Sequence, residues 1–112
     1  MNIDDITFQI RGAIFEVNKV LGYGFLEKVY EKALMIELSS RGVRVENQVP
    51  LKVSYKEQVV GEYFADLLVE DRVIVEIKAV TNLLNEHQAQ LLNYLKATGI
   101  KVGLLVNFTR DK

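Results

Sequence analysis

Residues 64–80 read FADLLVEDRVIVEIKAV, and this stretch decides the fold. Two runs of residues typical of strands, Val59 to Glu70 and Val73 to Val80, meet in it. The polar residues 70–72 between them are short enough for a tight hairpin turn. The sequence therefore predicts two neighbouring antiparallel strands.

Three charged residues with the spacing Asp-x9-Glu-x-Lys lie within this hairpin, at Asp66, Glu76 and Lys78. If Val69 faces Val73, then Asp66 lies directly opposite Glu76, and strand alternation places Lys78 on the same face. Cβ atoms of such cross-strand neighbours are about 4.5–5.5 Å apart, so the two carboxylates would repel each other. A divalent cation between them is the simplest explanation, and oxygen ligands favour Mg²⁺ over zinc.

The alternative for these three charges is a solvated strand face with a salt bridge. Their surroundings argue against it, because the neighbouring residues on both faces are apolar, as in central strands. Buried charges persist only when they are paired or bound to metal. The apolar neighbours are Ala65, Leu67, Leu68, Val69, Val73, Ile74, Val75, Ile77 and Ala79.

The composition predicts one domain, residues 1–112, because 112 residues with 49% apolar content can bury a core of their own. The absence of cysteine excludes disulfides, zinc-thiolate sites and thiol nucleophiles, and it is compatible with the cytoplasmic location that we expect. No signal peptide or membrane-spanning stretch is recognisable. The net charge of -1 lacks the basic footprint of a dedicated nucleic-acid binder, but it leaves room for a local positive groove.

The N-terminal part of the chain predicts two helices and a strand. Apolar residues at helical spacing indicate a helix from Ile3 to Leu21, which residues 22–24 (Gly-Tyr-Gly) end. A second helix is expected from Phe25 to Ser40. The stretch from Val43 to Tyr55 resembles a strand, and Pro50 within it predicts an edge strand or a break.

A third helix and a last strand are expected after the Glu-x-Lys strand. Asn85 is a good helix cap with Gln88 in the capping-box position, the helix should reach about Ala97, and Gly99 should close it. Ile100 to Phe108 then predicts a strand that a crossover places parallel to its neighbour. The predicted fold class is α/β, with a mixed four-stranded sheet flanked by helices in the order α-α-β-β-β-α-β.

Five helical side chains are further candidates for the site. Glu27 lies in the first turn of the second helix, where the helix dipole favours an anion. Glu31 lies one turn later and is expected to be solvated, and Tyr30 shares part of the same surface. Gln90 and Tyr94 form a polar strip on the third helix, which by itself requires no function.

The segment Gly24-Phe-Leu-Glu27-Lys-Val-Tyr30 matches the Gly-x-x-Glu-x-x-Tyr signature of the GxxExxY proteins, a branch of the PD-(D/E)xK nuclease superfamily. The chain also resembles this family over residues 61–66, 75–79 and 90–95. The resemblance extends from about Ile3 to Phe108. It implies a restriction-endonuclease-like fold.

The resemblance also implies roles for the acidic residues and the lysine. In such nucleases Asp66 and Glu76 would bind Mg²⁺ or Mn²⁺, together with the main-chain carbonyl of Ile77. Lys78 would orient or activate the attacking water. Glu27 would complete the acidic cluster through a water.

Three further residues are expected near the substrate. Gln90 and Tyr94 resemble the Gln-x-x-x-Tyr pair of RecB-type nucleases, which contacts substrate, and Tyr30 is expected to contribute to the same surface. The residue before Asp66 is Ala65 where the superfamily name has proline, a departure that many members share.

The function expected from the sequence is metal-dependent phosphodiester hydrolysis of DNA, or less readily of RNA. The alternatives are a non-catalytic binding or accessory module that retains the nuclease fold and a small-molecule phosphate-ester hydrolase. Nucleic acid is the expected partner and a membrane is not. Homodimerisation is compatible with the small size, although no residue requires it.

Overall fold

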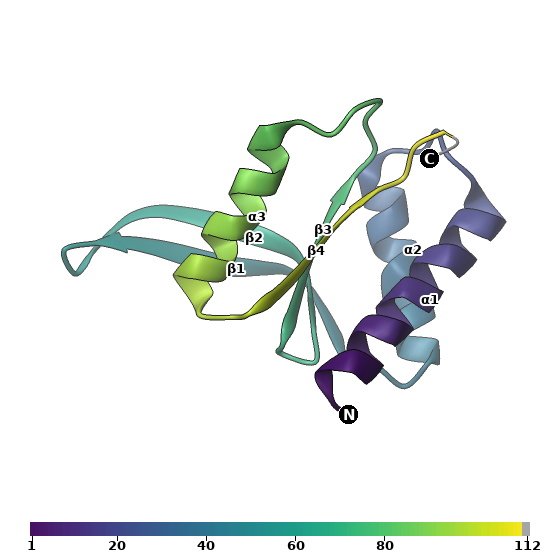
Figure 1. Ribbon diagram of the computed structural model, residues 1–112, viewed down its shortest axis with the longest axis horizontal. Coiled ribbons are helices and arrows are strands. Elements are labelled where there is room, and N and C mark those ends of the chain that lie inside the picture. The colour runs from purple at the N-terminus through teal and green to yellow at the C-terminus, as the bar shows by residue number, and fades with distance from the viewer. Residues whose placement is uncertain (111–112) are drawn as a thin grey trace.

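The computed structural model describes residues 1–110, and its elements follow the predicted order (Figure 1). The sheet has the strand order β1-β2-β3-β4, in which β4 is parallel to β3 and the other neighbours are antiparallel. Helices α1 and α2 cover one face and α3 covers the other (Figure 1). The elements are α1 (Ile3–Leu21), α2 (Glu27–Ser40), β1 (Val45–Tyr55), β2 (Gln58–Val69), β3 (Val73–Lys78), α3 (Asn85–Thr98) and β4 (Val102–Asn107).

Most predicted boundaries agree with the structure, and two local predictions need comment. Pro50 lies within β1 and pairs with Phe64, so β1 continues through Pro50 at the edge of the sheet, and its register shifts only further on, between Val53 and Ser54. The capping box predicted for Asn85 and Gln88 is wrong, because Leu84 is the cap residue of α3 and its main-chain N–H donates to Nδ1 of His87. No helix of residues 1–110 is long and apolar enough to cross a membrane.

Two hydrophobic clusters lie on opposite faces of the sheet. The larger one joins α1 and α2 to β2 and β3, and the smaller one joins α3 to β1, β2 and β3. Residues of the larger cluster include Ile6, Ile10, Leu34, Leu38, Leu67, Val69, Val73, Val75 and Ile77. Residues of the smaller cluster are Leu51, Ala65, Ile74, Leu91 and Tyr94.

Strand alternation breaks in β2 at Asp66. Leu67 packs in the larger cluster and Ala65 in the smaller one, although residues two apart on a regular strand share a face. The break has a counterpart in β1, where Gln48 has a φ of 50°, a value uncommon outside glycine. At Asp66 and Gln48 the two strands therefore change which of their residues face α1 and α2 and which face α3.

The connection between α1 and α2 is held by Tyr30. Its hydroxyl donates to the carbonyl of Gly22 at 2.6 Å and accepts from the N–H of Phe25 at 3.2 Å. Its ring stacks on Phe108 with centroids 4.2 Å apart. Gly24 in this turn has a φ of 109°, which only glycine adopts readily.

Replacing Tyr30 with Phe should destabilise the fold by about 1–2 kcal/mol, because two main-chain groups lose their hydrogen-bond partner while the ring packing remains. Urea denaturation monitored by circular dichroism measures this change. Tyr23→Phe is the matched control, since Tyr23 lies in the same turn and is exposed. Equal losses in both variants would contradict the role of the Tyr30 hydroxyl.

Candidate active site on strands β2 and β3

Two hydrogen bonds tie Asp66 to β3, one to Glu76 and one to Ile77. The main-chain N–H of Asp66 donates to Oε2 of Glu76 at 2.8 Å, and that of Ile77 donates to Oδ2 of Asp66 at 2.7 Å. The predicted register is confirmed from Val69 and Val73 up to the pair of Leu67 with Val75. At Asp66 and Glu76, hydrogen bonds between main chain and side chain replace the main-chain hydrogen bonds of the sheet. Asp66 and Glu76 are therefore neighbours, but they do not form a regular strand pair.

Both carboxyl groups resist ionisation. Burial raises the pKa of Glu76 to about 7, and the negative charge of Asp66 adds to the effect. Burial also raises the pKa of Asp66, although the hydrogen bond from Ile77 opposes the shift. Such shifts are frequent at functional sites, because a buried pair of like charges needs a neutralising partner.

The positive charge of Lys78 acts on both carboxylates. It lies two residues after Glu76 at the end of β3 and is partly exposed. Its ammonium lowers the pKa of Asp66 and that of Glu76, in each case against the larger effect of burial. The Asp66, Glu76 and Lys78 side chains therefore act on one another.

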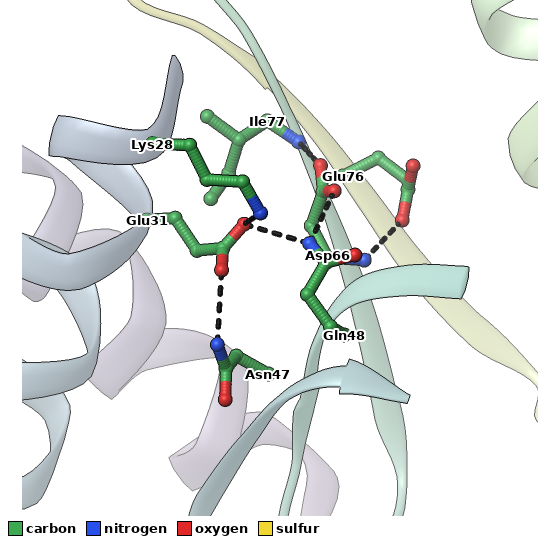
Figure 2. Close-up of polar contacts among 7 residues, drawn as sticks. All are labelled: Lys28, Glu31, Asn47, Gln48, Asp66, Glu76 and Ile77. Carbon is green, nitrogen blue, oxygen red and sulfur yellow. Dashed lines mark hydrogen bonds and ion pairs between the residues drawn. The ribbon is translucent and has the colours of Figure 1, made fainter. Parts of the chain in front are cut away.

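Glu31 belongs to this site, contrary to the expectation that it is solvated. Only 4% of Glu31 is exposed, and its carboxylate accepts from the amides of Asn47 at 3.1 Å and Gln48 at 2.9 Å. Gln48 also lies 3.4 Å from Oδ1 of Asp66. Figure 2 shows Asp66 with Glu31 on one side and Glu76 on the other.

A sequence signal for the burial of Glu31 exists. Glu31 precedes Leu34 by three residues and Leu38 by seven, so all three lie on the buried stripe of α2. Gln48 gives no comparable signal, because its position depends on the break in strand alternation.

Glu27 is exposed, but it is directed toward the end of β3. Its Oε2 accepts from the main-chain N–H of Ala79 at 3.2 Å. Its charge also contributes to the raised pKa of Glu76, after burial and the effect of Asp66. As the first residue of α2, it lies in the helix turn that the sequence predicted.

The three side chains expected near the substrate occupy different environments. Tyr94 is 6% exposed, and its pKa is raised by burial and then by Glu76 and Asp66. Gln90 lines a groove beside it. Tyr30 is completely buried and its hydroxyl is satisfied within the α1–α2 connection, so its expected contact with substrate is corrected to a structural role.

The donor chemistry of the site fits a hard divalent cation held largely by water. Within residues 1–110 no three His, Asp or Glu side chains converge as a preformed metal-binding set. Mg²⁺ commonly uses only one or two carboxylates and keeps several waters. Main-chain N–H groups hold one oxygen of each carboxylate, so the candidate ligands are Oε1 of Glu76 and Oδ1 of Asp66, which also accepts from the Gln48 amide at 3.4 Å.

An α/β sheet with a carboxylate pair and a lysine on two adjacent strands, flanked by helices on both faces, defines a restriction-endonuclease-like protein. A family model described as PD-(D/E)XK nuclease superfamily matches residues 4–112. The chain belongs to this superfamily, whereas its placement in the GxxExxY branch stays a prediction. Neither the search of curated proteins nor that of solved structures returned a match.

Proposed function

We propose that the protein is a metal-dependent nuclease that hydrolyses phosphodiester bonds in DNA, and less readily in RNA. The observation that carries this proposal is the hydrogen bond between Asp66 and Glu76, together with the charge of Lys78 that acts on both carboxylates. Membership of the nuclease superfamily supports the same reaction class. A divalent cation held by these carboxylates would offset their negative charge and attract a phosphate.

Asp66 and Glu76 would hold Mg²⁺ or Mn²⁺, and the carbonyl of Ile77 is a further candidate ligand. The ion would supply Lewis-acid polarisation of the phosphate and a lower pKa for bound water. Lys78 would donate to the scissile phosphate or to the attacking water and stabilise the developing negative charge. Glu27 would bind water at the open end of β3.

The helical residues have positioning roles in this proposal. Glu31 holds Gln48, and Gln48 lies against Asp66, so Glu31 would fix the orientation of that carboxylate without contacting substrate. Tyr94 and Gln90 would form the wall of the site on the α3 side.

The second candidate function is a non-catalytic module that binds nucleic acid together with a partner. The net charge of -1 favours it, and residues 1–110 contain no preformed three-ligand metal site. The Lys78 ammonium, whose charge acts on both carboxylates, favours the enzyme, because pure binding does not require it. We also expect cytoplasmic location and leave homodimerisation as a proposal.

A cleavage panel tests this function. Labelled single-stranded and double-stranded DNA and RNA are incubated with the purified protein in Mg²⁺, in Mn²⁺ and in EDTA, and the products are separated on denaturing gels. We expect cleavage of DNA in either metal and none in EDTA. Intact substrates under every condition would favour the non-catalytic module.

A further inference from the structure

A groove lies between α3 and the projecting end of the β1–β2 hairpin. Its volume is about 880 Å³, which is within the range of ligand sites. The hairpin extends beyond α3, so the groove has one wall from the helix and one from the strands (Figure 1). Tyr63 and Tyr94 contribute aromatic rings, and Lys52, Lys96 and Glu86 contribute charges.

Tyr63 offers a flat aromatic surface to this groove. Its side chain is 48% exposed, and its ring centroid lies 5.8 Å from that of Tyr94 at an interplanar angle of 45°. Gly61 lies against the ring, and a Cβ at Gly61 would be only 3.3 Å from Cε2 of Tyr63. The glycine therefore lets the ring lie close to its own strand.

The inner end of the groove adjoins the candidate active site. Tyr94 packs in one cluster with Ala65, which precedes Asp66, and with Ile74. Ile74 and Glu76 are two residues apart on β3 and so face the same side of the sheet. In Figure 2 the Glu76 carboxylate points away from the α2 residue Glu31, which agrees with this direction.

The charge of the groove differs from that of the whole chain. Lys52 and Lys96 line it together with one acidic residue, Glu86, whereas the chain carries a net charge of -1. A local positive site of this kind attracts a phosphate backbone. Aromatic rings beside basic side chains form the usual platform for an unpaired strand, because only unpaired bases expose both faces for stacking.

We propose that this groove holds a single unpaired polynucleotide strand, with a base stacked on Tyr63 and the phosphates near Lys52 and Lys96. The groove leads this strand toward Asp66 and Glu76. This inference rests on the proposed nuclease function and specifies its substrate as an unpaired strand, in preference to a duplex. The shared ligand chemistry is that of single-stranded DNA and RNA.

The test is fluorescence anisotropy of the full chain with labelled oligothymidylate and oligouridylate of about 12 nucleotides, and with a duplex of the same length, in EDTA. We expect the single strands to bind at least about tenfold more tightly than the duplex. Tyr63→Ala should weaken binding about tenfold or more, whereas Tyr63→Phe should retain it, because stacking needs the ring and not the hydroxyl. The oligonucleotide that binds more tightly shows whether the groove prefers single-stranded DNA or single-stranded RNA.

Lysine variants test the electrostatic part of the inference. Lys96→Glu should weaken binding and reduce the dependence of log K on log salt by about 0.7 for each lost phosphate contact. Lys19→Glu is the matched control, because Lys19 is exposed on α1, on the other face of the sheet. An equal effect of the two charge reversals would contradict a phosphate contact at Lys96.

Two results would contradict the proposal that the groove binds an unpaired strand. One is duplex binding as tight as single-strand binding, and the other is unchanged affinity in Tyr63→Ala with a native circular dichroism spectrum. Because binding is measured in EDTA, neither result depends on cleavage. Conversely, single-strand binding that requires Tyr63, in a protein that cleaves nothing, would support the groove and count against the proposed hydrolysis alone.

Discussion

Replacing Lys78 with Ala is expected to slow metal-dependent cleavage by about 10²- to 10⁴-fold and to leave Mn²⁺ binding in place. The positive charge of Lys78 lowers the pKa of both Asp66 and Glu76 against the effect of burial, and we expect the same charge to stabilise a phosphate during cleavage. The carboxylates that would hold the ion remain in the variant. Initial rates on a labelled oligonucleotide, at saturating Mn²⁺, measure the effect.

Lys19→Ala is the control for this substitution, because it removes the same charge from an exposed position on α1. Its cleavage rate should equal that of the wild type. A Lys78→Ala variant that cleaves at the wild-type rate would exclude Lys78 from the reaction, whatever its proximity to the carboxylates.

Without metal, the free energy of unfolding is expected to fall as the pH rises from about 4.5 through about 7. The pKa of Glu76 is about 7 in the folded protein and 4.5 as its ordinary value. The folded state therefore binds the proton more tightly than the unfolded state. The stabilisation is fully present below pH 4.5 and is lost as Glu76 ionises, by about 1–3 kcal/mol in total.

Glu76→Gln isolates this contribution, because glutamine does not titrate and groups that do not interact with Glu76 contribute equally to both proteins. The difference between wild type and variant in urea denaturation should change across this pH window and level off above it. Glu46→Gln, an exposed carboxylate on β1, should show no such change. A constant difference between wild type and Glu76→Gln would contradict the raised pKa of Glu76.

Local sequence patterns predicted the helices and strands, because each of these elements depends mainly on residues that are close in the sequence. Helical spacing gave the range of α1, and the three-residue turn fixed the register of β2 against β3. Gly99 ends α3 in a left-handed conformation, as its sequence position predicted.

The detailed geometry of the carboxylates could not be predicted in this way. Regular strand alternation predicts that Asp66 pairs directly with Glu76. In the structure this alternation breaks at Asp66 on β2 and at Gln48 on β1. This break depends on two helical layers that pack on opposite faces, which is a tertiary effect. The groove beside Tyr63 likewise depends on how far the hairpin extends past α3.

For two side chains on α2, Glu31 and Tyr30, the structure differs from the prediction. The spacing of Glu31 to Leu34 and Leu38 places it on the buried stripe of α2, although a charged residue on a helix is usually solvated. The burial of Tyr30 depends on Phe108, which lies at the far end of the sequence. No local pattern links those two rings.

Calorimetric titration with Mn²⁺ tests the claim that Asp66 and Glu76 bind one divalent cation. Titrations slightly below pH 7, in two buffers of different ionisation enthalpy, count the protons released. We expect saturable binding with release of part of one proton from Glu76, weaker binding without that release in Glu76→Gln, and wild-type behaviour in Glu46→Gln. Equal Mn²⁺ affinity in wild type and Glu76→Gln, or no saturable binding at all, would contradict the claim.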